Sequence, residues 1–320
     1  MRNKNLRVLL IMDYWRGAEE KWGMSNENYH FMGSLSSIPW VTVDRICPDS
    51  GVVNRDGREE IATDTCNIDY IRAWHDNRKP DVIVCMETNG VKAEDICRLR
   101  RQIETPVVEI WFDSSPSRIE KIHDEYSNID LHILLDGVET TLPDRFMWIP
   151  TPMDPTITFN DFRERPIPVS YMGRVLDCDG KRWERIQALR AAEIPVYHRG
   201  GQGEDIIPVM EYYDIFRSSK ISLNFAAPGK LKGRVQEVTM CGALLMEPEV
   251  GAGKYLFEPG KEIVTFGSSL DLIDKVRYYL AHDEERENIA RAGYDRVVRD
   301  YNANALWSQV FERVLGNNCA

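Results

Sequence analysis

Several features that would narrow the function of this 320-residue chain are missing from its sequence. The 7 cysteines form no CxxC pair, so neither a zinc site nor a disulfide framework is expected. No GxGxxG motif follows the first apolar run, so the dinucleotide-binding fingerprint is absent. The apolar run in MRNKNLRVLLIMDYW is too short for a signal peptide or a membrane span, which predicts a cytoplasmic protein.

An excess of basic residues is also missing. Lys and Arg number 40 against 51 Asp and Glu, which gives a formal net charge of -11. Nucleic-acid-binding domains usually carry a basic surface, so no nucleic-acid partner is expected, and tight docking on anionic lipid is disfavoured as well. The modest acidic excess indicates no more than solubility.

What the sequence does contain is a repeated alternation of apolar strands and amphipathic helices. In the first half, strands are expected at 6–12, 40–46, 81–85, 106–111 and 129–135, with helices at 61–76 and 91–102. This order predicts an α/β fold with parallel sheets and right-handed crossovers. The polar, turn-rich segment 23–39 is interpreted either as an acceptor-binding loop or as a plain surface connection.

Prolines indicate where the chain passes from one domain to another. The segment 147–155, MWIPTPMDP, holds three of them, and proline continues neither helices nor central strands. We therefore expect an N-terminal domain over 1–150 and a C-terminal domain over 151–301. A helix within 302–320 is expected to pack back toward the N-terminal domain.

The rest of the chain is arranged around the stretch 223–249, LNFAAPGKLKGRVQEVTMCGALLMEPE, which predicts a strand, a glycine-bearing loop, a helix and a strand. Lys230, Lys232 and Arg234 gather where the helix begins, and open backbone amides there favour an anion such as phosphate. Glu237, one turn further on, is placed to accept hydrogen bonds from two neighbouring sugar hydroxyls. The alternative is a solvated basic loop before an ordinary core helix.

A second loop in the C-terminal half repeats this arrangement. Gly173 follows the strand predicted at 168–172 and lets the backbone approach a ligand. Arg174 and Lys181 put positive charge at the strand end and at the start of the next helix, a pair suited to a diphosphate. The sequence Asp177-Cys178-Asp179 spells DxD beside these cations, but we interpret it as a turn and expect no metal.

Acceptor-side residues are expected at the carboxyl ends of strands in the first half, where open α/β sheets bind ligands. Asp113 follows the strand at 106–111 directly and is a candidate general base, or a group that orients the acceptor. It could equally be the N-cap of the helix after Pro116. Trp15 and Arg16 follow the first strand in the same way.

Two glycine-rich segments complete the candidates in the second half. The cluster Gly251-Ala252-Gly253 could admit a sugar against the backbone. The loop at 199–203 could wrap a nucleobase or form a simple turn.

Taken in order, these motifs resemble the nucleotide-binding domain of GT-B glycosyltransferases, closest to the "glycosyl transferases group 1" domain of spore-maturation-type proteins. The resemblance spans about residues 168–301 and is carried by YMGRVLDCDGKRWERIQAL, KISLNF…GRVQEVTMCGALLMEPE and YLFEPGKEIVTFGSSLDLIDKVRYYLAHDEERENIARAGYDRVVRDY. It implies a GT-B-like architecture in which two Rossmann-type parallel-sheet domains face a cleft, the N-terminal one on the acceptor side.

The resemblance also implies roles for individual residues. Arg174 and Lys181 match the pair that grips the donor diphosphate, and Arg234 lies near the phosphates. Glu237 matches the glutamate that holds the nucleotide ribose, and Gly242 matches the small residue that lets helix and strand pack closely.

Asp113 falls where related enzymes place an acidic or histidine residue. The sequence departs from the family pattern at Gly229, where many relatives carry a second glutamate that meets the donor sugar. Donor-sugar contacts and a retaining outcome are therefore not carried over.

The activity so implied is a hexosyltransferase-like glycosyltransferase, which moves a sugar from a nucleotide-diphosphate sugar to a hydroxyl of a glycan, protein or small molecule. Arg174, Lys181 and, with them, Lys232 and Arg234 would stabilise the departing diphosphate without a metal or another cofactor. Two alternatives remain: a GT-B-fold sugar-nucleotide epimerase, which would need a second acid/base set, and a non-catalytic module that binds nucleotide sugars.

Overall fold

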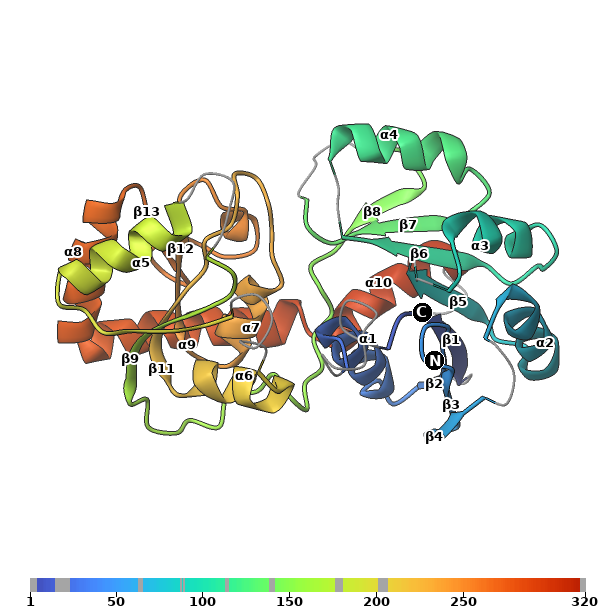
Figure 1. Cartoon of the computed structure of the whole chain (residues 1–320), viewed down its shortest axis with the longest axis horizontal. Helices are drawn as coiled ribbons and strands as arrows, with labels where there is room; N and C mark the ends of the chain where they lie inside the picture. The colour runs from blue at the N-terminus through green and yellow to red at the C-terminus, as the bar shows by residue number, and fades with distance from the viewer. Residues whose placement is uncertain are drawn as a thin grey trace. The chain divides into compact units, whose positions relative to one another are not determined.

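A computed structural model describes the chain except for residues 1–4, 15–23, 63–65, 87, 89, 113–114, 138–141, 176–180, 201–206 and 317–320. The chain divides into two units, Met1–Pro155 with Ala303–Ala320 and Thr156–Asn302, and each has a sheet of its own (Figure 1). The predicted α/β class with parallel sheets is confirmed. In the described part of the chain, no helix combines the length and the apolar character needed to cross a membrane.

The first unit contains an eight-stranded sheet. Its strands are β1 Leu6–Ile11, β2 Val41–Cys47, β3 Val52–Arg55, β4 Arg58–Ile61, β5 Val82–Met86, β6 Val107–Trp111, β7 Leu131–Leu134 and β8 Phe146–Trp148. The order is β4-β3-β2-β1-β5-β6-β7-β8, with parallel pairing from β2 to β8 and an antiparallel β3–β4 hairpin at one edge. Because both faces are covered, the central strands are almost continuously apolar.

Among its described residues, the unit has the helices α1 Asn26–Ser36, α2 Ile68–Arg78, α3 Ala93–Arg100, α4 Pro116–Glu125 and α10 Ala303–Leu315. Helix α1 corrects the loop expected at 23–39. The Ser25 side chain caps it by accepting a hydrogen bond from the backbone N–H of Asn28. Gly33 is needed inside this helix because a Cβ there would lie 2.0 Å from a carboxylate oxygen of Asp154.

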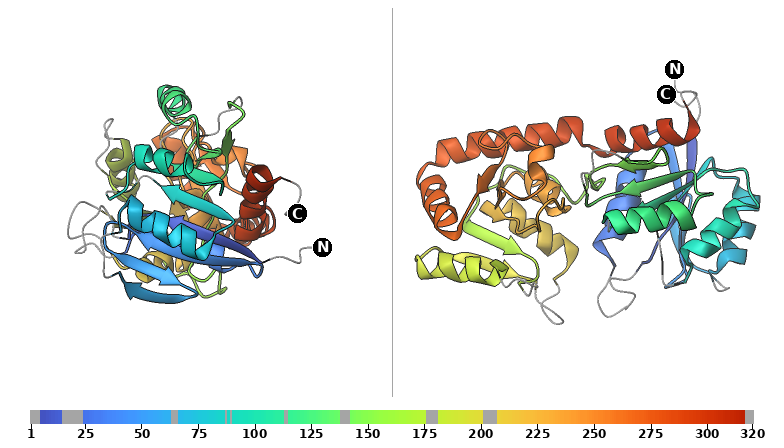
Figure 2. Two further views of the ribbon diagram at one scale, coloured as in Figure 1. Left: turned by 90° about the vertical axis from the view of Figure 1, so that its right-hand side faces the viewer. Right: turned by 90° about the horizontal axis from the view of Figure 1, so that it is seen from above.

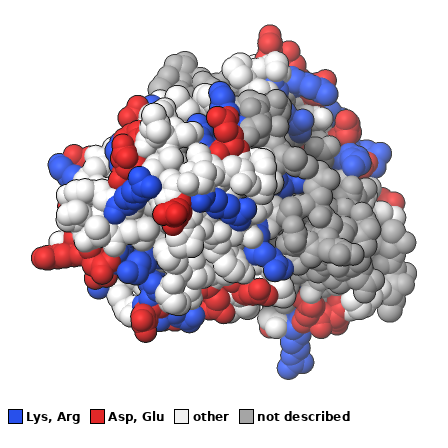
Figure 3. Space-filling model, turned by 60° about the vertical axis from the view of Figure 1, so that its left-hand side comes forward, with Lys and Arg blue, Asp and Glu red and all other residues white. Residues whose placement is uncertain are grey.

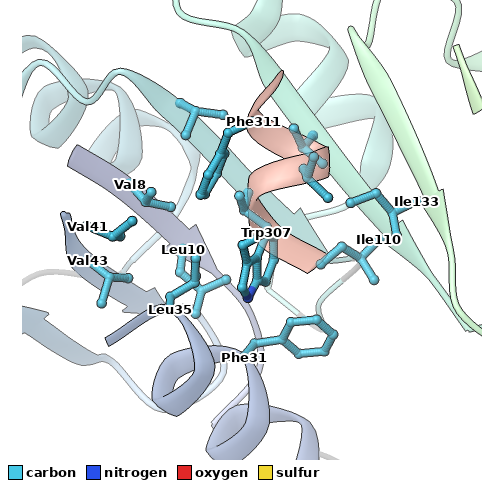
Figure 4. Close-up of a cluster of buried hydrophobic side chains, with 14 of the residues drawn as sticks. Val8, Leu10, Phe31, Leu35, Val41, Val43, Ile110, Ile133, Trp307 and Phe311 are labelled. Carbon is cyan, nitrogen blue, oxygen red and sulfur yellow. The ribbon is translucent and has the colours of Figure 1, made fainter. Parts of the chain in front are cut away.

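Helix α10 completes the core of the first unit, although it lies at the far end of the sequence. It contacts α1, and Figure 2 shows it in red beside the blue elements of this unit. Trp307 is fully buried, with its ring centroid 6.1 Å from that of Phe31 and 5.8 Å from that of Phe311 (Figure 4). Its indole N–H donates a hydrogen bond of 2.9 Å to Ser34 Oγ.

The second unit contains a five-stranded parallel sheet. Its strands are β9 Ile167–Met172, β10 Val196–Arg199, β11 Ser219–Leu223, β12 Leu244–Pro248 and β13 Val264–Phe266, in the order β10-β9-β11-β12-β13. The strand order reverses at β9, whose neighbours are β10 on one side and β11 on the other. Ligands of open α/β sheets bind outside the carboxyl ends of the strands at such a switch point.

Helices cover the second sheet: α5 Lys181–Ala191, α6 Val209–Arg217, α7 Arg234–Met240, α8 Ser269–Ala281 and α9 Asp283–Asp300. Helix α6 contacts β9, β11 and α7, while α7 also contacts β12 and α9. Helices α5 and α8 contact each other as well as β10 and β13, respectively. The pair α6–α7 therefore stands beside the switch point.

The described cysteines are core residues rather than ligands or disulfide partners. Cys85 and Cys241, expected to be small core residues, are both buried and free, as are Cys47, Cys66 and Cys97.

On the face drawn in Figure 3, basic and acidic side chains of the described residues are interspersed.

Candidate functional site

Two glycines bring the loops after β9 and β10 together at the carboxyl edge of the second sheet. Gly173 has φ +155° and Gly200 has φ +105°, backbone conformations that residues other than glycine rarely adopt. A Cβ on Gly200 would lie only 2.8 Å from the backbone nitrogen of Gly173, so the two loops pack backbone to backbone. His198 Nε2 adds a contact of 3.0 Å to the Gly173 carbonyl oxygen.

The guanidinium of Arg234 lies against the backbone of Gly173. A Cβ on Gly173 would be 2.8 Å from Nη2 of Arg234, and the guanidinium carbon is 5.6 Å from the ring centroid of Tyr171. Burial disfavours the charged form of Arg234, but Tyr212, Tyr171 and Glu237 more than offset it, so its pKa is raised. Arg234 therefore remains a cation at the end of β9, where Gly173 was predicted to admit a ligand.

Glu237 lies one turn along α7 from Arg234 and is almost completely buried. The Tyr212 hydroxyl donates to its Oε2 at 2.8 Å, and the Tyr213 hydroxyl donates to its Oε1 at 3.0 Å. Burial raises the pKa of both tyrosines and the Glu237 charge raises it further, so both phenols stay protonated donors. The structure therefore brings Gly173, Arg234 and Glu237 together, and it adds two tyrosines that the sequence analysis missed.

The other predicted cations lie in loops and helix starts that follow β9 and β11. Arg174 is exposed just after β9, Lys181 is the exposed first residue of α5, and Lys232 is exposed two residues before α7. Arg182, which the sequence analysis did not single out, donates from Nε to the Phe225 carbonyl oxygen at 3.2 Å. This bond ties the start of α5 to the segment that leaves β11.

Open backbone amides were expected at the start of α7, but the structure shows three of these N–H groups hydrogen-bonded to backbone carbonyls, so for them the expectation is wrong. The Val235 N–H donates to the Lys232 carbonyl oxygen at 3.0 Å, and the N–H groups of Gln236 and Glu237 both donate to Gly233 at 2.9 Å. Gly233 already has helical φ and ψ, so these amides close tight turns instead of pointing at a ligand.

The Gly251-Ala252-Gly253 cluster makes room for a side chain of the protein, which corrects the idea that it admits a sugar. A Cβ on Gly253 would lie 2.3 Å from Glu247 Oε1, and one on Gly251 would lie 2.8 Å from Glu247 Cδ. Glu247 ends up fully buried at the end of β12, where Asn224 Nδ2 donates to its Oε2 at 3.1 Å. Burial raises the pKa of Glu247 to about 7.

Gly242 allows close packing, as the sequence predicts, but the partner is the segment before β9. It has φ +74°, and a Cβ there would lie 2.2 Å from Asn160 Nδ2 and 2.8 Å from Arg165 Nη2.

Candidates in or near several loops lie outside the described residues: Asp113, Trp15, Arg16, the Asp177–Asp179 turn and most of the 199–203 loop. The N-cap of α4 is Ser115, so the N-cap interpretation of Asp113 is wrong and its catalytic role stays a prediction. Within the described residues, no group of three or more His, Cys, Asp and Glu is arranged to hold a metal ion.

A separate cavity of about 390 Å³ lies at the opposite, amino-terminal edge of the second sheet. Arg163, Arg165, Lys220 and Arg286 line it, but each is engaged by carboxylates or backbone carbonyls of the same unit. This cavity is distinct from the candidate site.

Comparisons with known proteins agree with this arrangement. Residues 167–312, a little under half of the chain, match the family model described as glycosyl transferase-like. No curated protein matches the chain.

Among solved structures, a glycosyltransferase from Rickettsia africae aligns with a TM-score of 0.63 and 11% identity, over 99% of this chain and 100% of that one. Sucrose-phosphate synthase from Thermosynechococcus elongatus aligns with a TM-score of 0.65 and 13% identity, over 97% and 99%. Anabaena Alr3699/HepE in complex with UDP aligns with a TM-score of 0.58 and 10% identity, over 96% and 99%.

The fold is therefore that of GT-B glycosyltransferases, as the resemblance in the sequence predicts. The family match places a glycosyl transferase-like domain in the C-terminal part of the chain. The chain therefore combines a glycosyl transferase-like domain over residues 167–312 with the fold of GT-B glycosyltransferases.

Proposed function

We propose that the second unit binds a nucleotide-diphosphate sugar at the carboxyl edge of its sheet, and that the protein transfers the sugar to a hydroxyl acceptor. The observation that supports this most is the pairing of Arg234, held on the Gly173 backbone, with Glu237 one turn further along α7. A fixed cation suits a diphosphate, and a buried carboxylate beside it suits the adjacent ribose diol.

The cationic residues would act on the leaving group. As the bond between the sugar carbon and the phosphate oxygen breaks, negative charge develops on the diphosphate, and Arg174, Lys181, Lys232 and Arg234 would stabilise it. Asp113 of the first unit would orient the acceptor hydroxyl or take its proton as the new glycosidic bond forms. No metal is required in this scheme, because side chains supply the positive charge.

The first test is a thermal-shift screen of the full chain with UDP, GDP, ADP, TDP and their sugars, since a bound ligand stabilises the folded state by mass action. UDP is the first ligand to try because Alr3699/HepE is described in complex with UDP and with UDP-glucose. We expect one nucleotide to stabilise the protein selectively.

Titration calorimetry with that nucleotide then tests the site. Glu237→Ala and Arg174→Ala should each weaken binding about 10-fold or more, as expected for loss of a hydrogen bond to a charged group. Unchanged affinity in both variants would remove the site assignment.

Turnover tests the activity and the absence of a metal. Slow donor hydrolysis without acceptor, and transfer in an acceptor panel, should proceed at the same rate with EDTA. Binding without turnover across the panel would instead indicate a binding module. A rate lost in EDTA and restored by Mg²⁺ or Mn²⁺ would contradict the metal-independent scheme.

A further inference from the structure

Helix α6 grips the Glu237 carboxylate with two consecutive tyrosines. Tyr212 and Tyr213 donate to different oxygens, at 2.8 and 3.0 Å, and their ring planes are 86° apart with centroids separated by 5.1 Å. One phenol on each oxygen, from two nearly perpendicular rings, fixes both the position and the plane of the carboxylate. A single hydrogen bond would leave it free to rotate about the side chain.

The two phenols also stabilise the ionised form of the buried Glu237 carboxylate. A buried carboxylate is costly unless its charge is paired and hydrogen-bonded. An ionised carboxylate has about four acceptor positions, of which the phenols use two. The phenols therefore stabilise the charged form that two ribose hydroxyls require and orient it for them.

We infer that Tyr212 and Tyr213 are positioning residues that make the site discriminate ribonucleotides from 2′-deoxyribonucleotides. The inference rests on the proposed function, in which Glu237 holds the ribose and Arg234 the diphosphate. It assigns the discrimination between ribonucleotides and 2′-deoxyribonucleotides to residues of α6, which lies outside the loop-and-helix motif that contains Arg234 and Glu237.

The test measures two ratios of dissociation constants by calorimetry. The deoxy ratio, 2′-deoxy-UDP to UDP, reports on recognition of the ribose, and the UMP ratio, UMP to UDP, reports on recognition of the diphosphate. The variants are Tyr212→Phe and Tyr213→Phe, which keep the rings. The matched control is Tyr278→Phe, which removes an exposed phenol–carboxylate hydrogen bond of 2.7 Å to Glu285 in the same unit. A merely structural role would change thermal stability without changing either ratio.

For Tyr213→Phe, we expect the deoxy ratio to fall about 10-fold toward 1, with the UMP ratio unchanged, because one hydrogen bond to a charged group is lost. Tyr212→Phe should lower the deoxy ratio in the same way and leave the UMP ratio unchanged, and Tyr278→Phe should change neither ratio. A double variant keeps the test informative if Tyr213→Phe alone loses stability. Glu237→Gln carries no buried charge, so the double variant Glu237→Gln/Tyr213→Phe should have the same deoxy ratio as Glu237→Gln alone.

The outcomes separate the two proposals. Absence of binding by every nucleotide in the thermal-shift screen overturns the proposed function, and the inference with it. Binding that Glu237→Ala leaves unchanged removes the site assignment and the inference. Binding that depends on Glu237, with wild-type ratios in both tyrosine variants, overturns the inference alone. A change of the UMP ratio as large as that of the deoxy ratio in either tyrosine variant also overturns the inference.

Discussion

Glu247 shows how one buried side chain makes the second unit sensitive to pH. Its carboxyl is surrounded by the backbone of Gly251 and Gly253 and receives one hydrogen bond from Asn224. Burial raises its pKa from 4.5 to about 7, so in the folded protein it keeps its proton up to near neutral pH. Between pH 4.5 and 7 the unfolded chain has released this proton and the folded chain retains it, so stability falls as pH rises through that window.

Glu247→Gln should remove this fall in folding stability with pH, because glutamine resembles the protonated acid and does not titrate. We expect the variant to match the wild type at pH 4.5 and to exceed it by about 3 kcal/mol above pH 7. Urea unfolding of the second unit at several pH values measures the difference. Glu249→Gln, an exposed neighbour, is the control, and a gap for Glu247→Gln that does not change with pH would contradict the prediction.

At the residue scale, sequence position alone predicted the charged groups of the site better than their partners. Arg234 and Glu237 follow from where a loop meets a helix, and the structure brings them together. Tyr212, Tyr213 and Glu247 could not be assigned in the same way, because their roles depend on packing between segments more than 20 residues apart.

At the scale of elements, Arg165 holds the ends of two helices. Its Nη1 donates to the carbonyl oxygens of Phe216, Arg217 and Ser219 at the end of α6. Its Nη2 donates to the carbonyl oxygen of Cys241, the C-cap of α7. Cations stabilise helix C-termini, and the planar guanidinium can reach several carbonyls that an ammonium group cannot reach together.

Arg165→Lys should therefore destabilise the second unit by about 2–4 kcal/mol, because several buried carbonyls lose their donor while the charge is kept. Urea unfolding measures this loss. Arg163→Lys, in which an exposed ion-paired arginine is changed in the same way, should cost about 1 kcal/mol or less. Equal costs for the two variants would show that geometry at Arg165 does not matter.

Most strands and helices were predicted within a few residues, since buried parallel strands and amphipathic helices have strong patterns. The β3–β4 hairpin, helix α1 and strand β8 of the first unit were missed, and β8 overlaps the linker predicted at 147–155. The β3–β4 hairpin turns at Asp56-Gly57, both with positive φ, and this Asp-Gly signal lies in the segment 47–60, for which no element was predicted. Helix α1 was missed because Gly33 and many polar residues obscure its pattern, and the reason for Gly33 is a tertiary contact with Asp154.

At the scale of the whole molecule, the chain leaves the first unit after Pro155 and returns to it at Ala303. Helix α10 then contributes Trp307, Val310 and Phe311 to a core that also contains β1 and α1 side chains such as Leu10 and Phe31. The first unit therefore requires the last helix for its core, whereas the proposed nucleotide site lies entirely in the second unit. Stability of the first unit and nucleotide binding by the second should respond separately to mutation.

Trp307→Ala tests this separation in the full-length chain. Removal of a fully buried tryptophan should cost about 3–5 kcal/mol and lower the unfolding temperature of the first unit. The stabilisation of the second unit by UDP should stay the same, because no predicted donor-binding residue contacts α10 among the described interactions. Differential scanning calorimetry with and without UDP follows both transitions, and Ile61→Ala, an exposed position in the first unit, is the control. If Trp307→Ala abolished the UDP-induced shift, or lowered both transitions equally, the two units would have to unfold and bind as one.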